Sequence, residues 1–263
     1  MAPASSGRRP LLIKIGGSLM DDESALRGLC GALAAVRRDL PLVLVHGGGK
    51  DINRNLAWLN ETPVFRDGLR VTGEAALKVV EMTLSGHVNK KLVSLLNAAG
   101  ASAAGISGVD GPTLLCEPAA PELGRVGRVT EARTGLVDAL LAAGFLPVVS
   151  PISVDAARTH FNVNADDAAA ALASALRAQK LIFVSDVEGV RGADGARIPA
   201  LDGPAVDRLI SGGVATGGMI PKLKSCRAAV ASGIGEVHIC GFRDPESFAA
   251  QARGAGNSGT IIT

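Results

Sequence analysis

Two short apolar runs, each ending directly in glycines, constrain the fold of this chain more than any other feature. The runs are LLIKIGG, beginning at Leu11, and LVLVHGGG, beginning at Leu42. Each has the length of a buried strand, and each is followed by a longer segment with apolar residues at helical spacing. Strands that alternate with helical segments are typical of βαβ units. We therefore predict an α/β fold on a mostly parallel, open central sheet.

The remaining chain continues this alternation. We predict helices over 24–36, 50–56, 74–99, 165–176, 205–210 and 219–232, and strands over 103–107, 145–152, 181–185, 236–240 and 259–263. Asp22 or Ser24 can cap the first of these helices, and Gly100 can end the longest one. Residues 112–133 lack helical periodicity and indicate a hairpin. We expect a flexible tail over 1–10, an N-terminal lobe over 11–170 and a C-terminal lobe over 171–263.

Charge and composition exclude several classes of function. The 263 residues carry a formal net charge of +2, and aromatic residues, which stack on bases, make up only 3%, so we expect no nucleic-acid partner. No apolar run approaches the roughly 18 residues of a membrane span, and the run after Arg8-Arg9 is too short for a signal peptide. Four widely spaced cysteines without a C-x-x-C pair indicate reduced thiols, no zinc site and a cytoplasmic protein.

The second glycine turn looks like a phosphate-binding loop but does not match its pattern. The motif G-x-x-x-x-G-K-[ST], anchored on Gly49-Lys50, requires glycine at 44 and Ser or Thr at 51. The chain has Leu44 and Asp51. Two glycine turns at the carboxyl ends of two strands can nonetheless bring backbone N–H groups close to an anionic ligand. The alternative is that these glycines only terminate strands.

Lys14 lies inside the first apolar run. It alternates with Ile13 and Ile15, so its side chain points to the opposite face of the strand. On an edge strand such a lysine reaches solvent along the sheet. On a central strand its ammonium has to meet an anion, such as a phosphoryl group in transfer.

Two later stretches add polar groups of the same kind. NVNADD puts Asn162 and Asn164 on one side of a strand, with Asp166 at or near the N-cap of the next helix. A cap needs one polar residue, and four polar residues in six positions indicate a site. In GGMIPK, Lys222 lies about one turn into a helix, where the helix dipole disfavours a cation unless an anion compensates it. Lys224 fits a solvated surface position better.

The chain resembles the amino acid kinase family, and within it the members that phosphorylate N-acetyl-L-glutamate. The resemblance rests on six motifs in the family's order, between residues 12 and 262: IKIGGS, VHGGGKDIN, GLRVT, NVNADDAA, SDVEGV and GGMIPK. It implies a three-layer α/β/α sandwich of two lobes, the N-terminal one binding acetylglutamate and the C-terminal one ATP. The implied reaction transfers the γ-phosphoryl group of ATP to the γ-carboxylate of N-acetyl-L-glutamate, the second step of arginine biosynthesis.

The resemblance also implies roles for individual residues. Lys14 and Lys222 would flank the transferring phosphoryl group from the two lobes, and Asp166 would hold both lysines in place. Acetylglutamate would be bound by Gly48, Gly49, Arg70, Asn162 and Asn164. ATP and its phosphates would be bound by Gly16, Gly17, Ser185, Asp186, Val187, Glu188, Gly189, Val190, Arg191, Val214, Ala215, Thr216, Gly218 and Met219. Magnesium would be carried mainly by the phosphates of ATP and by water, and we name no protein ligand for it.

Other readings remain as alternatives. A sister kinase that acts on carrier-linked aminoadipate or glutamate is disfavoured by GLRVT and NVNAD. Carbamate, aspartate and glutamate 5-kinases are looser relatives, and we do not expect the added domain of the last two after residue 263. A catalytically inactive regulatory protein that binds nucleotides would not need Lys14, Asp166 and Lys222.

The resemblance finally bears on assembly and control. Family members that are inhibited by arginine carry an extra N-terminal helix that links dimers into a hexamer. Only thirteen residues precede Lys14, and Pro3, Gly7 and Pro10 interrupt them. We therefore expect a homodimer, formed through the long helix over 74–99, and an enzyme that is insensitive to arginine.

Overall fold

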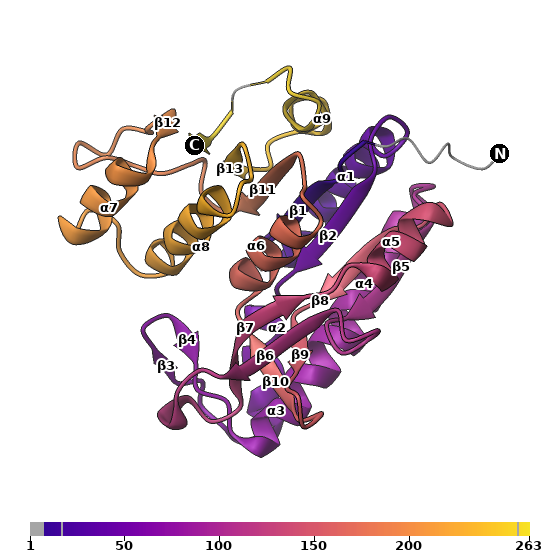
Figure 1. Cartoon of the computed structure of the whole chain (residues 1–263), viewed down its shortest axis with the longest axis vertical. Helices are drawn as coiled ribbons and strands as arrows, with labels where there is room; N and C mark the ends of the chain where they lie inside the picture. The colour runs from indigo at the N-terminus through magenta and orange to yellow at the C-terminus, as the bar shows by residue number, and fades with distance from the viewer. Residues whose placement is uncertain (1–7, 17, 257) are drawn as a thin grey trace.

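A computed structural model describes residues 8–16, 18–256 and 258–263, and in these residues one eight-stranded sheet runs through the protein (Figure 1). The strands lie in the order β12 (Ala200–Leu201), β14 (Thr260–Ile262), β13 (Val237–Gly241), β11 (Lys180–Ser185), β1 (Leu11–Ile15), β2 (Leu42–His46), β8 (Leu146–Ser150) and β5 (Ala103–Ser107). The six strands from β13 to β5 are parallel, β14 is antiparallel to β13, and β12 is parallel to β14. The prediction of an α/β fold on a mostly parallel sheet is confirmed.

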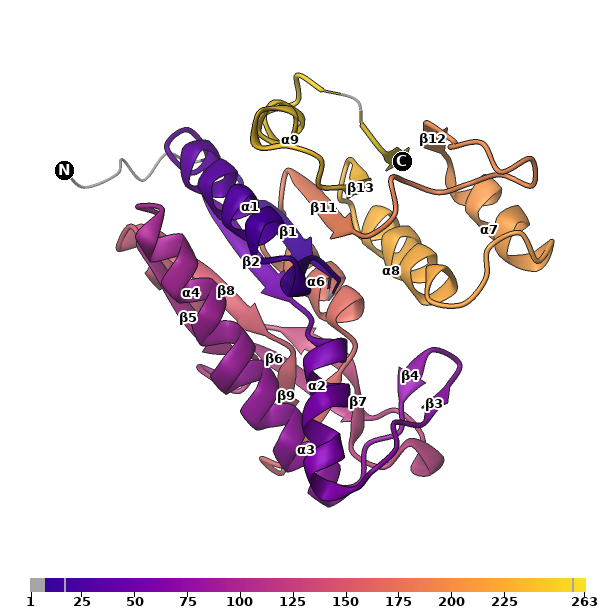
Figure 2. The same ribbon diagram turned by 180° about the vertical axis from the view of Figure 1, so that it is seen from behind.

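Helices cover both faces of this sheet. One face carries α1 (Glu23–Val36), α4 (Asn89–Ala98) and α9 (Pro245–Ala252) (Figure 2), and the other carries α5 (Gly135–Ala142), α6 (Ala165–Ala175) and α8 (Met219–Ala231), with α7 (Gly203–Ser211) beside α8. Because side chains alternate along a strand, Ile13 and Ile15 pack under the first set of helices and Leu12 packs under the second. Lys14 follows Leu12 in this alternation, so it faces α6 and α8.

The long helix is present, but it is not regular throughout. α3 (Glu74–Glu81), the π-helical segment η3 (Met82–Val88) and α4 follow one another without a break, and Gly100 ends them at a φ of 86°. The prediction of a helix over 74–99 is confirmed, whereas its π-helical middle has no counterpart in the sequence pattern. In α1, Asp22 rather than Ser24 is the cap, and its carboxylate accepts a hydrogen bond from the Ala25 N–H at 2.9 Å.

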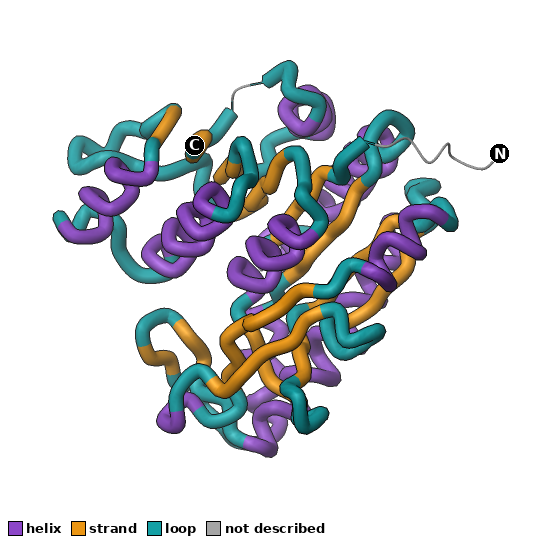
Figure 3. The backbone as a smooth tube through the Cα atoms, in the orientation of Figure 1, coloured by secondary structure: helices purple, strands orange, loops and turns teal. Residues whose placement is uncertain are grey.

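The hairpin over 112–133 belongs to a small closed barrel (Figure 3). Its strands β6 (Leu114–Pro118) and β7 (Val126–Ala132) are antiparallel, as expected, and β9 (Ile152–Val154) and β10 (His160–Val163) complete the barrel. The single strand predicted over 145–152 is wrong. Pro151 divides it into β8 of the main sheet and β9 of the barrel, because proline has no N–H to continue a ladder.

A second, smaller hairpin precedes the long helix in the sequence. β3 (Phe65–Arg66) and β4 (Leu69–Arg70) are joined by Asp67 and Gly68, both with positive φ, which is the two-residue turn that DG sequences favour. A Cβ atom on Gly68 would lie 3.2 Å from Cγ of Pro221 in α8. The hairpin therefore lies close to the first turn of α8.

The remaining differences from the sequence prediction are local. Helices α5 and α9 are missing from the predicted elements; α2 (Gly49–Leu56), α6, α7 and α8 are present as predicted, and η1 (Ser18–Asp21), η2 (Ala57–Leu59) and η4 (Pro121–Leu123) are single turns. Of the predicted tail, residues 1–7 lie outside the described part. Pro10 is buried and its carbonyl accepts a hydrogen bond from the Gln179 N–H at 3.0 Å, so it belongs to the fold. Residue 170 lies inside α6, and the division into two lobes stays a prediction.

The four cysteines are buried and free, as their spacing indicates. Burial raises the pKa of Cys30 to about 11, which keeps this thiol protonated and unreactive at neutral pH. Separately, none of the helices in the described ranges combines the length and the apolar character that a membrane span requires.

Candidate active site

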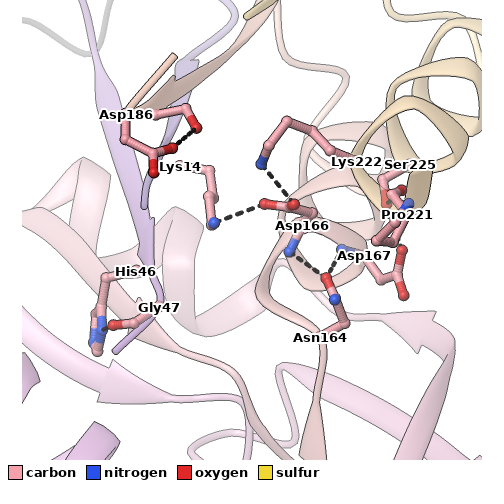
Figure 4. A network of polar contacts seen from close by, with 11 residues as sticks. Lys14, His46, Gly47, Asn164, Asp166, Asp167, Asp186, Pro221, Lys222 and Ser225 are labelled. Carbon is pink, nitrogen blue, oxygen red and sulfur yellow. Dashed lines mark hydrogen bonds and ion pairs between the residues drawn. The ribbon is translucent and has the colours of Figure 1, made fainter. Parts of the chain in front are cut away.

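Three charged side chains meet where β1, α6 and α8 converge at the carboxyl end of the sheet (Figure 4). Nζ of Lys14 lies 2.7 Å from Oδ1 of Asp166, and Nζ of Lys222 donates a hydrogen bond to Oδ2 of the same carboxylate at 2.7 Å. All three are buried, at 7–8% exposed. We call Lys14, Asp166 and Lys222 the lysine–aspartate centre. β1 is a central strand of the sheet, so Lys14 cannot reach solvent along a sheet edge. Its ammonium group meets the carboxylate of Asp166 instead.

The lysine–aspartate centre has two basic side chains and one acidic side chain. Burial alone would raise the pKa of Asp166, but the charges and hydrogen bonds of Lys14 and Lys222 outweigh it and lower the pKa to about 2. Burial lowers the pKa of Lys14, against the attraction of Asp166. The formal charges of two lysines and one aspartate sum to +1, and they lie in a poorly solvated place. Such a centre attracts an anion.

Helix capping explains why Asp166 is available for the lysines. The N-cap of α6 is Asn164, whose Oδ1 accepts hydrogen bonds from the N–H groups of Asp166 and Asp167 at 2.8 and 3.3 Å. The alternative that Asp166 only caps the helix is therefore wrong. In α8, Lys222 lies one turn from the start and its ammonium is 5.2 Å from the centre of the Phe183 ring, while Lys224 is exposed as expected.

A small pocket opens beside this centre. It has a volume of about 160 Å³, and its walls come from the turn Gly47–Gly49, the β3–β4 hairpin and the end of β10. Arg70 is buried in its wall, with Nη2 donating to the Gly49 carbonyl at 3.1 Å and the guanidinium 4.7 Å from the Phe65 ring. Its Nη1 is buried without a hydrogen-bond partner among the described residues. A buried, unpaired guanidinium nitrogen calls for an acceptor such as a carboxylate oxygen.

The two asparagines predicted to bind the substrate differ in what they can offer. Asn162 is half-buried in the pocket wall, and its Nδ2 donates to Thr72 Oγ1 at 3.2 Å. Asn164 also lines the pocket, but its carbonyl oxygen is occupied by the cap of α6, so its Nδ2 is what remains for a ligand.

Some backbone N–H groups of the two glycine turns are already hydrogen-bonded within the protein, and others are available to a ligand. The Gly16 N–H donates to the Val184 carbonyl at 2.8 Å in the sheet and is therefore already occupied, and the role of Gly16 in binding the phosphates of ATP stays a prediction. Gly17 lies outside the described residues. Gly47 donates to the Ile15 carbonyl at 3.1 Å. Gly48 and Gly49 make no such bond within the described chain, and they stand at the start of α2, where helix N–H groups are free.

Apart from Gly16 and Gly17, the residues predicted to bind ATP lie around two loops, one after β11 and one before α8. Ser185 ends β11 and is followed by Asp186 to Arg191, and Val214 to Gly218 lead into α8, which begins at Met219. Val190 and Ala215 have buried side chains, and their backbone N–H groups already donate to Thr260 Oγ1 at 2.8 Å and to the Leu209 carbonyl at 2.9 Å. Glu188 accepts a hydrogen bond from Arg243 at 2.7 Å, and Arg191 donates to the Gly195 carbonyl at 2.9 Å. The exposed loop residues Asp186, Thr216 and Gly218 are the freest to meet a ligand.

A larger cavity, of about 600 Å³, lies elsewhere, between β7, α6 and α8. Small alanine and serine side chains of the two helices form part of its walls, and the walls include neither lysine of the centre nor Arg70. Size would favour this cavity over the smaller pocket, but charge and unpaired donors favour the smaller pocket as the place of an anionic substrate.

Two buried residues next to the site are missing from the sequence prediction, His46 and Asn89. His46 is 0% exposed at the end of β2, and Asn89 donates a hydrogen bond to its ring at 3.1 Å. His46 directly precedes the glycine turn, and this position in the sequence could have indicated that it belongs to the site. Asn89 gives no local signal, because its partners come from β2 and β8.

Comparisons with known proteins agree on one family. A family model described as the amino acid kinase family matches residues 9–241. The acetylglutamate kinase of Rubrobacter xylanophilus is 43% identical over 254 residues, 97% of each chain. That of Geobacillus stearothermophilus is 43% identical over 88% of this chain and 89% of its own.

Solved structures agree on the fold. N-acetylglutamate synthase from Neisseria gonorrhoeae, in complex with coenzyme A and N-acetyl-glutamate, has a TM-score of 0.84 at 24% identity and covers 97% of this chain, which spans 60% of that one. Giardia carbamate kinase has a TM-score of 0.71 at 16% identity, covering 98% and 99% of the two chains. At these identities the likeness is one of fold alone.

Proposed function

The chain belongs to the amino acid kinase family, and we propose on this premise that it transfers the γ-phosphoryl group of ATP to the γ-carboxylate of N-acetyl-L-glutamate. The product is N-acetyl-L-glutamyl 5-phosphate, in the second step of arginine biosynthesis. Acetylglutamate kinases at 43% identity over nearly the whole chain support the enzyme class and its substrate. The observation that carries the mechanism is the buried lysine–aspartate centre beside a pocket with an unpaired guanidinium nitrogen.

In this proposal the two lysines neutralise charge during transfer. Both the attacking carboxylate and the leaving ADP are anionic, and phosphoryl transfer depends mostly on positioning and on stabilisation of charge. Lys14 comes from β1 and Lys222 from α8, and Asp166 keeps both ammonium groups in place by pairing with each at 2.7 Å. No general base is required, because a carboxylate nucleophile has no proton to remove.

Acetylglutamate would occupy the small pocket. The fork of Arg70 suits the α-carboxylate, and the free N–H groups of Gly48 and Gly49 and the amides of Asn162 and Asn164 would bind the rest. ATP would lie over the loops 185–191 and 214–219. Magnesium would be held by the phosphates and by water, where it neutralises phosphate charge; the described residues contain no group of three or more His, Cys, Asp or Glu side chains placed to hold a metal.

The proposed function is tested by the acyl phosphate that it produces. Hydroxylamine converts an acyl phosphate into a hydroxamate, which is measured with ATP and, in turn, acetylglutamate, glutamate, aspartate and bicarbonate-derived carbamate as acceptors. Acetylglutamate is expected to give the fastest turnover by a wide margin. Faster turnover with another acceptor would refute the substrate assignment. The buried, free cysteines support a cytoplasmic location for this reaction.

Replacing Arg70 by alanine should weaken acetylglutamate binding selectively. We expect the KM for acetylglutamate to rise by about tenfold to a hundredfold, since a charge-assisted bidentate contact contributes roughly 1.5–3 kcal/mol. The KM for ATP should change little. Arg66, exposed on the neighbouring strand β3, provides the control as Arg66→Ala. An equal rise in both KM values of Arg70→Ala would argue against a direct contact with the acceptor.

A homodimer through the outer face of the long helix is the second part of the proposal. Leu84, Val88 and Leu92 pack against the protein's own core, so the partner would meet the outer face, where Met82 is 63% exposed and a Cβ on Gly86 would have open space around it. Small residues at a contact allow two helices to approach closely.

Light scattering should therefore give twice the chain mass of 26.6 kDa. Gly86→Arg should reduce this mass to that of a monomer, whereas Gly31→Arg, at an equally open glycine of α1, should not. The same measurement with arginine, alongside a rate assay, tests the expectation that arginine alters neither mass nor rate. A hexamer, or a dimer that survives Gly86→Arg, would contradict this surface.

A further inference from the structure

His46 lies directly beneath the glycine turn and contacts it through one ring nitrogen. It is fully buried at the end of β2, and its Nδ1 is 2.9 Å from the carbonyl oxygen of Gly47. Its other nitrogen, Nε2, lies 3.1 Å from Nδ2 of Asn89, at the start of α4. Figure 4 shows His46 and Gly47 beside Lys14, and a Cβ on Gly47 would be 4.0 Å from Nζ of Lys14. Gly47, whose carbonyl the imidazole contacts, therefore lies next to the lysine–aspartate centre.

The neighbours of the ring determine which nitrogen carries the proton. Burial lowers the pKa of His46 to about 4, so the ring is neutral at pH 7, with one N–H donor and one acceptor. A carbonyl oxygen only accepts, so the proton is on Nδ1. Nε2 then accepts from Asn89, whose Nδ2 also donates to the Val148 carbonyl at 2.9 Å. That second bond fixes the amide orientation of Asn89, and therefore the tautomer of His46.

A fixed Gly47 carbonyl also fixes the next N–H group. The carbonyl of Gly47 and the N–H of Gly48 belong to one planar, trans peptide, so they point in opposite directions. Because His46 holds the carbonyl inward, the Gly48 N–H points away from the ring. The π-helical segment supports the turn from behind, since a Cβ on Gly48 would lie 2.7 Å from Leu84 and 3.2 Å from Val88. Gly48 lines the small pocket and its N–H is free within the described chain.

We propose that His46 is a positioning residue for phosphoryl transfer: its Nδ1–H tautomer, set by Asn89, aims the Gly48 N–H at the reacting end of the acceptor. The inference rests on the proposed function, because the acceptor in the pocket is acetylglutamate. Loss of the imidazole donor would let the Gly47–Gly48 peptide rotate and weaken the reaction, although His46 itself touches neither substrate nor the reacting atoms.

The tautomer can be measured directly in the unaltered protein. Long-range ¹H–¹⁵N correlation spectra distinguish a protonated from an unprotonated ring nitrogen, and His46→Asn identifies the resonances that belong to His46. We expect a protonated Nδ1 and an unprotonated Nε2 at pH 7. A protonated Nε2 would overturn the proposal, whatever the catalytic activity of the protein.

Two substitutions then separate the donor from the bulk of the ring. An asparagine amide nitrogen lies near the position of Nδ1 and can still donate to Gly47, whereas a glutamine amide lies near Nε2 and can reach only Asn89. His46→Gln is expected to lose about tenfold or more in kcat/KM for acetylglutamate, with the KM for ATP unchanged, because small misplacements cost up to a hundredfold. His46→Asn should retain most of the activity.

His238→Gln provides the matched control, since His238 is also buried but lies on β13. It should lower the Tm without the selective kinetic loss. Equal losses in His46→Asn and His46→Gln would mean that the imidazole acts through packing alone, and would overturn the proposal. An unaltered protein that turns over no acetylglutamate would refute the proposed function, and the tautomer measurement would still decide the assignment of His46.

Discussion

Replacing Lys222 by alanine is expected to lower kcat by about 10²–10³-fold, the loss typical of one electrostatic contact to the transition state. The KM for acetylglutamate should change far less, because the ammonium charge matters most while negative charge develops on the transferring group. Lys222 is 8% exposed and is held by Asp166 at 2.7 Å, so no other cation of α8 can take its place without rearrangement. The hydroxamate assay under saturating ATP measures the loss.

Two companion variants show whether charge is the cause. Lys222→Met keeps the aliphatic stem but removes the charge, and it should lose as much kcat as alanine does. Lys224→Ala removes an exposed lysine from the same helix and should keep normal rates. Near-normal turnover of Lys222→Ala would remove this residue from the mechanism, and recovery in Lys222→Met would point to packing instead.

Asp166→Asn should have the second large effect, on both activity and stability. The change leaves Lys14 and Lys222 buried and without the carboxylate that pairs with both. Breaking a buried ion pair by removing one partner typically costs about 3–5 kcal/mol in the free energy of unfolding. With the two ammonium groups no longer held together, we expect kcat to fall by about 10²-fold or more.

The stability loss should depend on pH in a defined direction. The pKa of Asp166 is lowered from 3.8 to about 2 in the folded state, so its contribution to stability is complete above about pH 4 and is lost as the pH falls through 2. The difference in unfolding free energy between the wild type and Asp166→Asn should therefore be largest at neutral pH and shrink between pH 4 and 2. Denaturant unfolding at pH 7, 4 and 2.5 measures it.

Asp167→Asn is the matched control for this prediction. Asp167 is the next residue of α6, and it accepts a hydrogen bond from Ser225 rather than from a lysine. Burial raises its pKa, so replacement by a neutral amide should cost less and should leave kcat nearly unchanged. Equal stability losses in the two variants, or a difference that does not change with pH, would contradict the assigned role of Asp166.

Much of the local structure could be predicted from the sequence, because its signals are local. The apolar runs at Leu11 and Leu42, the helical spacing over 74–99 and the glycine at 100 each depend on neighbours a few residues away. The alternation of β1 likewise puts Lys14 on the face opposite to Ile13 and Ile15. These properties follow from the periods of strands and helices.

Features that depend on strand order could not be predicted in this way. Pro151 separates two strands that enter different sheets, and the four barrel strands pair across gaps that no local pattern announces. The contact of Asn89 with His46 is a further example, as is the use of the Gly16 N–H by Val184. Each depends on which strands become neighbours, and short-range periodicity carries no information on that.

The lysine–aspartate centre likewise has features that local patterns predict and one feature that they do not. Local sequence patterns are enough to predict that Lys14 points away from Ile13 and Ile15, that polar residues gather around the start of α6, and that Lys222 lies where a helix needs an anion. The pairing of one carboxylate with both lysines is a property of the folded chain alone, since residues 14, 166 and 222 meet through the packing of α6 and α8 on β1. Side-chain direction is set by local backbone geometry, whereas the partner it meets is set by how distant elements pack.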